Sequence, residues 1–313
     1  MATYKILISD GLDESGKVVL RAAGDVADID GISADNLLKD IADYDALIVR
    51  GRTKVTPAVF AAGKKLKVVG RAGIGVDNID LAAAKAAGAA VVNSPLATTV
   101  TVAELALGMM LALARELPRA DASMKGGKWL KKEFEGIELF GKTLGVIGYG
   151  RIGAAVAKRA AAFDMHILGY DPIKPADQIR QEGGEPVSFD ELLARSDFVT
   201  LHLPLTPQTK NMLNAAVFEK MKTGVYIVDA ARGGVIDEEA LVVALNSGKV
   251  AGAALDVFSA EPPGLTSLVA HPKLIATPHI GAQTLEAQAR AGYDISTEIV
   301  AALKGEALRW RVA

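Results

Sequence analysis

The chain has 313 residues, of which 50% are hydrophobic and only 5% aromatic, so it is long enough for two domains with cores built from Ala, Val, Leu and Ile. Its 35 basic and 37 acidic residues leave a net charge of -2, which argues against nucleic acid or a membrane surface as a partner. There is no cysteine, so disulfides, thiolate catalysis and Cys-ligated metals are excluded, and the four histidines lack metal-ligand spacing. We therefore expect no metal.

The amino terminus carries no sign of a targeting segment. It runs directly into a β-rich stretch that contains a lysine, without the basic head and apolar core of a signal peptide. The longest apolar stretch, Leu105 to Ala114, is about half of the ~20 residues that a bilayer requires. We expect a cytoplasmic protein without a membrane partner.

Short Val- and Ile-rich runs alternate with Ala-rich segments of helical period, which is typical of parallel sheets with crossover helices. In the first part of the chain the predicted strands are Lys5–Ser9, Asp25–Asp28, Ala46–Val49, Lys67–Val69 and Ala89–Asn93. The predicted helices between them are Asp13–Ala23, Ser33–Ile41, Pro57–Ala62 and Asp80–Ala87. This pattern predicts a compact α/β unit of just under 100 residues.

A long helix is predicted next, from Thr99 or Val100 to Arg115, with Thr99 or Thr101 near its cap and Pro118 as its stop. It is apolar nearly all round, so it must be buried against more than one partner. It either joins the two domains and helps to form a subunit interface, or it lies wholly within the core of one domain.

The second part of the chain begins at Gly141 and carries six predicted strands, a number that fits a doubly wound sheet. They are Thr143–Ile147, His166–Tyr170, Phe198–Leu203, Val225–Asp229, Gly252–Val257 and Leu274–Thr277. A final helix, Gln283–Leu303, is expected to return the chain to the first domain. We predict two α/β domains, residues 99–286 forming one that is inserted in a smaller one made of residues 1–98 and 287–313.

A nucleotide site is predicted where the first strand of the second part runs into its helix. Gly148, Gly150 and Gly153 stand in G-x-G-x-x-G order, and Asp171 follows 18 positions after the last glycine. The glycines allow a tight turn, a close approach of the pyrophosphate and close packing of helix and strand, and the helix N-terminus attracts phosphate. Asp171 would accept the ribose hydroxyls and repel a 2′-phosphate, which favours NAD, although Lys174 is near enough to leave NADP open.

Three polar residues follow consecutive strands of the second part: Arg232, Glu261 and His279. The carboxyl ends of parallel strands meet at one edge, so all three can converge on one crevice. His279 can act as acid and base near neutral pH, and Glu261 would hold its ring and favour the imidazolium. Arg232 would orient a carboxylate or carbonyl. This set suits hydride transfer between a nicotinamide and a 2-hydroxy or 2-oxo acid.

A second cluster of cations follows the strand Ala46–Val49, where Arg50 and Arg52 are separated by one glycine. Side chains alternate along an extended chain, so both guanidiniums could point to the same side and bind a ligand with more than one negative group. Solvated arginines at a strand end are the plainer interpretation. The nearby sequence "GRAGIGVDN" is expected to form a strand-end loop whose backbone amides could hold an anion.

Several segments together resemble the D-isomer-specific 2-hydroxyacid dehydrogenases, from near residue 4 to near residue 305. The sequences that carry the resemblance are "VGRAGIGVDNID", "GKTLGVIGYGRIG", "GYDP", "DAARGGVIDEEAL", "AGAALDVFSAEPP" and "TPHIGAQTLEAQ". The likeness is greatest to the phosphoglycerate dehydrogenases of that family. It implies two Rossmann-like domains, a doubly wound NAD-binding domain inserted in a flavodoxin-like substrate domain, and a homodimer or higher homo-oligomer. Independently of the resemblance, Trp129 is expected to be an interface anchor, because aromatic side chains are favoured at interfaces.

The resemblance also implies roles for individual residues. It makes Arg232, Glu261 and His279 the catalytic triad, in agreement with the chemical interpretation, and it places a substrate carboxylate on the backbone of Ile74 and Gly75. Arg50 and Arg52 would then hold a substrate phosphate. The implied NAD contacts, beyond the glycines, are Arg151, Ile152, Asp171, Leu203, Ala230, Asp256 and Gly281. Because the sequence ends at Ala313, no C-terminal regulatory domain is expected.

Three functions remain open at this point. The first is NAD-dependent oxidation of D-3-phosphoglycerate to 3-phosphohydroxypyruvate in serine biosynthesis. The second is another dehydrogenase or reductase of the same fold that acts on hydroxypyruvate, glyoxylate or sulfolactate, because Ile74 and Leu203 stand where polar residues are frequent in the family. The third is a non-catalytic protein that senses NAD.

Overall fold

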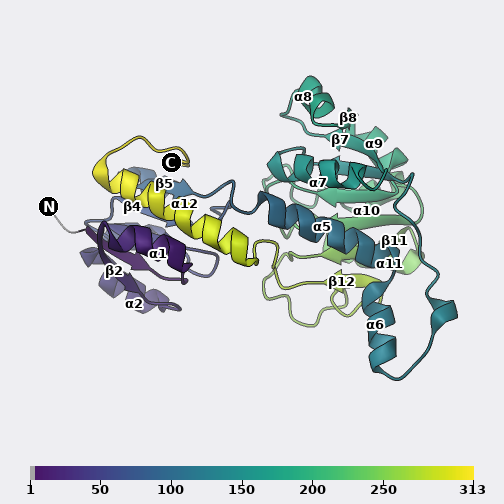
Figure 1. The fold of residues 1–313 in the computed structure, drawn as a ribbon, viewed down its shortest axis with the longest axis horizontal. Helices are drawn as coiled ribbons and strands as arrows, with labels where there is room; N and C mark the ends of the chain where they lie inside the picture. The colour runs from purple at the N-terminus through teal and green to yellow at the C-terminus, as the bar shows by residue number, and fades with distance from the viewer. Residues whose placement is uncertain (1–3) are drawn as a thin grey trace. The chain divides into compact units, whose positions relative to one another are not determined.

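The computed structural model describes residues 4–313, and the contacts among its Cα atoms divide the chain into two compact units (Figure 1). Unit 1 contains the chain up to Thr98 together with Ala282–Ala313, and unit 2 is Thr99–Gly281. The sequence-based division at 286 and 287 lies inside the last helix, which begins at Leu285. The whole of that helix packs in unit 1, so the division from contacts comes earlier in the chain.

Unit 1 is built around a five-stranded sheet, and all of its strand pairs are parallel. Its strands are β1 (Tyr4–Ile8), β2 (Gly24–Asp28), β3 (Ala46–Val49), β4 (Val68–Arg71) and β5 (Ala90–Asn93), in the order β2-β1-β3-β4-β5. Its helices are α1 (Glu14–Arg21), α2 (Ala34–Asp40), α3 (Pro57–Ala62), α4 (Leu81–Ala86) and α12 (Leu285–Lys304), with a short 3-10 turn at Ile41–Asp43. This strand order is that of flavodoxin-like folds and confirms the predicted fold class.

Two apolar cores cover the two faces of this sheet. On one face Leu47 and Val49 pack with side chains of α2, α3 and α4. On the other face Ala46 and Ile48 pack with side chains of α1 and α12. Successive residues of a strand point to opposite faces, and every residue of β3 is buried, which is why its sequence is apolar without interruption.

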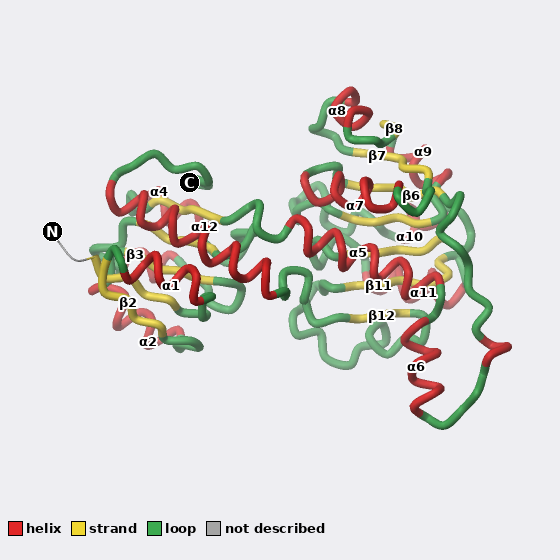
Figure 2. The backbone as a smooth tube through the Cα atoms, in the orientation of Figure 1, coloured by secondary structure: helices red, strands yellow, loops and turns green. Residues whose placement is uncertain are grey.

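Unit 2 is built around a seven-stranded sheet, again with parallel pairs throughout (Figure 2). Its strands are β6 (Thr143–Ile147), β7 (His166–Tyr170), β8 (Glu185–Pro186), β9 (Phe198–Leu201), β10 (Val225–Asp229), β11 (Val250–Leu255) and β12 (Leu274–Ala276), in the order β12-β11-β10-β9-β6-β7-β8. Its helices are α5 (Thr99–Ala114), α6 (Leu117–Lys125), α7 (Arg151–Ala161), α8 (Ala176–Gln181), α9 (Phe189–Arg195), α10 (Ala215–Lys220) and α11 (Glu238–Ser247), with a 3-10 turn at Lys131–Glu133.

Helices cover both faces of this sheet as well. Tyr226 and Val228 of β10 pack with α5 and α7, whereas Val225 and Ile227 pack with α10 and α11. The order of the strands reverses between β6 and β9. At such a point a doubly wound sheet has a crevice at the carboxyl ends of its strands. The predicted doubly wound sheet is therefore confirmed.

Three strands of unit 2, β9, β11 and β12, have bounds that differ from the predicted ones by one or two residues. Two other features of unit 2 also differ from the sequence-based prediction. A seventh strand, β8, was not predicted, because it has only two residues and contains Pro186, which is tolerated at a sheet edge. Pro118 does not end the long helix: α5 ends at Ala114, and Pro118 lies in the first turn of α6, a helix that the sequence pattern missed. Proline suits that first turn, whose N–H groups have no partner within the helix.

Candidate active site

The turn between β6 and α7 has the geometry that a dinucleotide requires. Gly148 has a φ of 86°, and a Cβ there would lie 2.5 Å from the carbonyl oxygen of His202. A Cβ at Gly153 would lie 2.2 Å from the carbonyl oxygen of Gly148, so helix and strand pack too closely for a side chain. A Cβ at Gly150 would meet no protein atom within 4 Å. Packing within the protein therefore does not require glycine at Gly150, whereas a ligand close to the backbone would.

The N-terminus of α7 is open to a phosphate. Gly150 is its N-cap and offers no side chain to bond the first-turn N–H groups, which have no partner within a helix. Arg151 and Ile152 are the first residues of this turn. The backbone N–H groups of this first turn and the positive end of the helix dipole together suit the pyrophosphate of NAD.

Asp171 lies directly after β7, where the adenosine ribose is expected. Its carboxylate accepts hydrogen bonds from the backbone N–H of Tyr149 at 3.0 Å, Ile173 at 2.9 Å and Lys174 at 3.0 Å. A carboxylate has about four acceptor positions, so one remains for a ribose hydroxyl. The Lys174 ammonium donates to the carbonyl oxygen of Tyr149 at 2.9 Å and pairs with Glu182. Because this cation already has two partners, it offers little to a 2′-phosphate, and NAD is favoured.

The other expected cofactor residues come from the carboxyl ends of neighbouring strands of unit 2. They are Leu203 after β9, Ala230 after β10, Asp256 after β11, and Gly281 after β12. Asp256 is buried, and its carboxylate accepts hydrogen bonds from the hydroxyl of Thr277 at 2.6 Å and from the backbone N–H of Ile280 and Gly281, both at 2.7 Å. Asp256 thus fixes the segment that carries His279.

His279 and Glu261 form a direct pair, although 18 positions separate them in the sequence. The Nδ1 atom of His279 lies 2.8 Å from Oε2 of Glu261, while Oε1 of Glu261 accepts the backbone N–H of Phe258 at 3.2 Å. His279 has a φ of 53°, a left-handed conformation that is costly for a residue with a side chain and typical of functional sites. With Nδ1 turned to the carboxylate, Nε2 is the ring nitrogen that can exchange a proton with a ligand.

Arg232 lies in the turn after β10, and this turn packs against the segment that carries Glu261. A Cβ at Gly233 would lie only 1.8 Å from the carbonyl oxygen of Phe258, and Gly234 has a φ of 83°. The guanidinium of Arg232 donates to the carbonyl oxygen of Ala231 at 2.6 Å. Two glycines therefore let the arginine turn approach the neighbouring strand end.

Asp229, the last residue of β10, is a buried carboxylate close to Arg232 that the sequence pattern did not single out. Asp229 is only 2% exposed, and its Oδ1 accepts the backbone N–H of Ala231 at 2.8 Å. Burial raises the pKa of Asp229 to about 7, against the lowering influence of hydrogen bonds from Ala231 and Arg232 and of the charge of Arg232. The negative charge of Asp256 raises this pKa further.

This pKa predicts a pH-dependent stability that Asp229→Asn should remove. Between about pH 4 and pH 7 the folded protein retains a proton that the unfolded chain has lost, so the free energy of unfolding falls as pH rises through this window. At about 1.4 kcal/mol per pKa unit, the wild type should lose roughly 3 kcal/mol more than Asp229→Asn between pH 5 and pH 8. Urea denaturation of both proteins at the two pH values tests this, and equal losses would contradict it.

In unit 1 the loop after β4 presents two backbone N–H groups. The hydroxyl of Ser94 accepts the N–H of Gly73 at 2.7 Å, and the side-chain amide of Asn93 donates to the carbonyl oxygen of Ile74 at 2.7 Å. The N–H groups of Ile74 and Gly75 donate to no acceptor in the part of the chain that the structure describes. They are therefore available to a carboxylate, as the resemblance implies.

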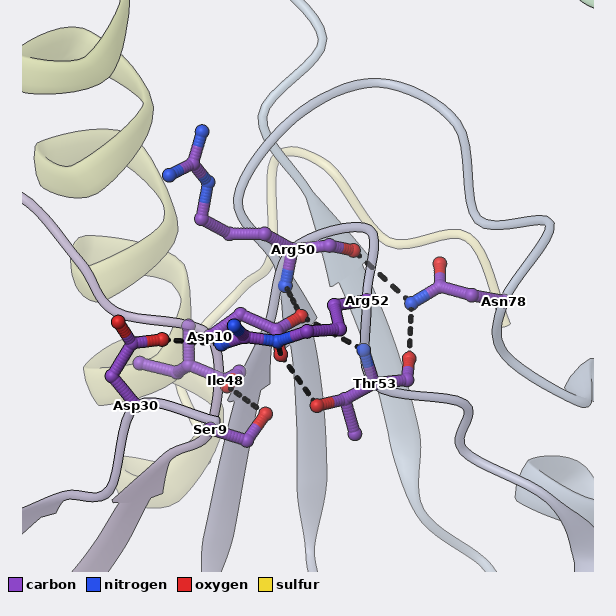
Figure 3. Close-up of polar contacts among 8 residues, drawn as sticks. All are labelled: Ser9, Asp10, Asp30, Ile48, Arg50, Arg52, Thr53 and Asn78. Atoms are coloured by element: carbon purple, nitrogen blue, oxygen red, sulfur yellow. Dashed lines mark hydrogen bonds and ion pairs between the residues drawn. The ribbon is translucent and has the colours of Figure 1, made fainter. Parts of the chain in front are cut away.

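Arg50 and Arg52, also in unit 1, have different surroundings (Figure 3). The guanidinium of Arg52 pairs with Asp30, and its Nε lies 3.6 Å from Oδ1 of Asp10. The half-buried side chain of Arg50 points away from both carboxylates and forms no ion pair within residues 4–313. Of the two cations, only Arg50 has a charge that no carboxylate offsets.

Sequence reasoning missed the residues that surround these arginines, namely Asp10, Asp30 and Asn78. Asp10 is buried, and it stands just past the carboxyl end of β1, the same kind of position that singled out the other site residues. That signal was present in the sequence. The bonds from Asp10 to residues 40 and 43 positions later were not visible there.

Within residues 4–313, no helix combines the length and the apolar character needed to cross a membrane.

Comparison with known proteins gives a family and several relatives. The profile of the family "D-isomer specific 2-hydroxyacid dehydrogenase, NAD binding domain" matches residues 107–281. The chain is 50% identical over 303 residues to a D-3-phosphoglycerate dehydrogenase of Methanocaldococcus jannaschii, covering 96% of this chain and 58% of the relative. It is 49% identical to a chloroplastic D-3-phosphoglycerate dehydrogenase of Arabidopsis thaliana, covering 96% of this chain and 49% of that one. The chain thus spans about half the length of these curated relatives.

Solved structures of similar proteins cover the chain from end to end. A glyoxylate reductase from Paecilomyes thermophila is 32% identical, with a TM-score of 0.90 over 100% of this chain and 99% of that one. The TT0316 protein from Thermus thermophilus is 34% identical, with a TM-score of 0.90 over 99% of this chain and 100% of that one. The chain belongs to the D-isomer-specific 2-hydroxyacid dehydrogenase family and carries its NAD-binding domain.

Proposed function

We propose that the protein oxidises D-3-phosphoglycerate to 3-phosphohydroxypyruvate with NAD, the step that leads toward serine. The observation that carries the choice of substrate is Arg50, whose guanidinium has no carboxylate partner within the described residues. A phosphate is the group that such a cation binds well. The sequence identity to D-3-phosphoglycerate dehydrogenases supports the same choice.

The geometry of unit 2 supports the catalytic roles that we propose. When bound, NAD supplies the acceptor for the hydride that leaves C2 of the substrate. Nε2 of His279 takes the proton of the C2 hydroxyl, while Glu261, 2.8 Å from Nδ1, holds the ring and balances the charge of the imidazolium. Arg232 orients the substrate carboxylate and carbonyl oxygen through charge-assisted hydrogen bonds. Reversal of these steps reduces the 2-oxo acid.

The substrate carboxylate has a second candidate partner in unit 1. The N–H groups of Ile74 and Gly75 belong to a loop that two side chains hold in place. Ser94 accepts the N–H of Gly73, and Asn93 donates to the carbonyl oxygen of Ile74. A pair of adjacent free N–H groups is a common anion-binding arrangement. We assign them to the carboxylate and Arg50 to the phosphate.

The test is NAD reduction by the purified protein with D-3-phosphoglycerate and, as the phosphate-free control, D-glycerate. We expect a kcat/KM roughly 10- to 100-fold higher for the phosphorylated acid, and we expect Arg50→Ala to remove most of this preference, since a hydrogen bond to a charged group is worth about 1.5–3 kcal/mol. Equal kcat/KM values for the two acids would contradict the assignment. Tight binding of NADH without turnover of any 2-oxo acid would instead indicate the NAD-sensing protein.

A second candidate function is the reduction of hydroxypyruvate or glyoxylate. The observation in its favour is the likeness of the chain to the solved structure of a glyoxylate reductase, which is 32% identical with a TM-score of 0.90. Under this function Arg50 would not affect kcat/KM. The sulfolactate type would instead depend on Arg50, through a sulfonate in place of the phosphate.

We also propose that the chain forms a homodimer through α6 and the segment that follows it, as far as Phe140. α6 contributes no buried residue, and it extends from the sheet of unit 2 (Figure 2). Four large apolar side chains of this region are more than half exposed: Leu117, Met124, Trp129 and Phe140. Aromatic side chains exposed in this way are typical anchors of subunit interfaces.

A further inference from the structure

The turn formed by residues 50 to 53 is held at both of its ends by two side chains from distant parts of unit 1 (Figure 3). Asp10 accepts the backbone N–H of Arg50 at 2.8 Å and that of Thr53 at 3.1 Å. Asn78 donates to the carbonyl oxygen of Arg50 at 3.1 Å and to that of Thr53 at 2.7 Å. Both backbone polar groups of Arg50 are therefore fixed, one by each side chain.

Asp10 is suited to this task because it is buried and fully engaged. Its side chain is 3% exposed, and its Oδ1 accepts the hydroxyl of Thr53 at 2.5 Å in addition to the two backbone bonds of Oδ2. A buried carboxylate is stable only where hydrogen bonds and opposite charge replace water. Arg52 supplies that charge, since its Nε lies 3.6 Å from Oδ1.

The charges of the cluster are thus divided unequally between the arginines. The guanidinium of Arg52 contacts two carboxylates, those of Asp10 and Asp30. Asp10 fixes the backbone of Arg50 through a hydrogen bond. The guanidinium of Arg50 has no carboxylate partner within the described residues.

We propose that Asp10 and Asn78 are positioning residues that hold Arg50 toward the substrate phosphate, and that Arg52 serves as the counter-ion of Asp10 and does not bind the phosphate. This inference rests on the proposed function, because it assigns Arg50 to that phosphate. It adds a specific mechanism: side chains that never touch the substrate determine the affinity for its phosphate through the position of one arginine.

The test compares kcat and KM for D-3-phosphoglycerate and D-glycerate in Asp10→Asn, Arg50→Ala and the double variant of the full chain. Asp10→Asn keeps the shape of the side chain and removes its charge and one acceptor. It should raise KM for the phosphorylated acid about tenfold, leave kcat within about twofold and leave KM for D-glycerate unchanged. In the Arg50→Ala background, the same change should raise KM by less than about twofold, because two residues that act through one contact are not additive.

The matched control is Asp45→Asn. Asp45 also accepts a backbone N–H, that of Lys5 at 3.0 Å, and pairs with a cation, Lys67 at 3.2 Å, but it lies at the opposite end of β3. Its replacement should leave both KM values unchanged. Asn78→Ala is the alternative variant if the thermal transition shows that Asp10→Asn does not fold. It should also raise KM for the phosphorylated acid, and this effect should disappear in the Arg50→Ala background.

Arg52→Gln distinguishes a counter-ion from a ligand. Added to Arg50→Ala, it should leave KM for the phosphorylated acid unchanged, whereas a further rise of tenfold or more would overturn the inference. An Asp10→Asn effect that is equal for both acids, or that persists without Arg50, would also overturn it while the proposed function stands. If Arg50→Ala itself leaves the preference for the phosphorylated acid intact, the assignment of Arg50 fails, and this inference fails with it.

Discussion

Replacement of His279 by alanine is expected to lower kcat roughly 100- to 10,000-fold, the usual contribution of a positioned acid and base. The reason lies in the pair with Glu261, which turns Nδ1 away at 2.8 Å and leaves Nε2 to take the substrate proton. The measurement is the rate of NADH formation at saturating substrate, with NADH affinity determined in parallel by fluorescence titration. That affinity should change little, because the role that we propose for His279 involves the substrate and not NADH.

His166 provides the matched control for this experiment. It is an exposed histidine and the first residue of β7. It therefore lies at the amino ends of the strands, whereas the candidate site residues lie at their carboxyl ends. His166→Ala should retain the wild-type kcat. If His279→Ala kept more than a tenth of the wild-type kcat, another group would have to supply the proton transfer.

The second large effect is expected from the glycines of the nucleotide turn. Gly150→Ala should weaken NAD binding roughly 10- to 100-fold and leave the thermal midpoint unchanged, because its Cβ meets no protein atom within 4 Å. Gly153→Ala should lower both the NAD affinity and the thermal midpoint. Its Cβ would lie 2.2 Å from the carbonyl oxygen of Gly148 and would push helix and strand apart. Isothermal titration with NAD and thermal denaturation measure the two effects separately.

Gly108→Ala is the control for the Gly-to-Ala change itself. Gly108 lies on an exposed position of α5, and a Cβ there would meet nothing within 4 Å. Alanine is the better helix former by about 1 kcal/mol, so this variant should be as stable as the wild type or slightly more stable, with unchanged NAD affinity. A fall in thermal midpoint for Gly150→Ala as large as that of Gly153→Ala would show that the turn cannot accept any side chain, with or without NAD.

Much of the fold could be predicted because local pattern and burial agree. The strands Ala46–Val49, Thr143–Ile147, His166–Tyr170 and Val225–Asp229 were predicted with the bounds that the structure has. In α/β sheets covered on both faces, such strands are continuously apolar and short, so they stand out from the helices between them. β8 was missed because it is a two-residue edge strand, for which no such pattern can exist.

The residues of the candidate site could be found because parallel strands all end at one edge of a sheet. Polar residues just after a strand are therefore candidates wherever they stand in the chain, and Arg232, Glu261 and His279 were singled out on that ground. Their catalytic roles remain predictions until the variants are measured. The same rule would have pointed to Asp10, which follows β1.

The sequence by itself determined the two α/β units, the nucleotide turn with its three glycines, and the strand ends at which functional side chains gather. These features depend on local periodicity and on fixed spacings of a few residues. Only the tertiary structure decided which of two arginines has an unbalanced charge. That depends on Asp10 and Asp30, which lie 20 or more positions away in sequence and pair with Arg52 in space. Burial and pairing of charges are properties of the folded surroundings, and no local pattern encodes them.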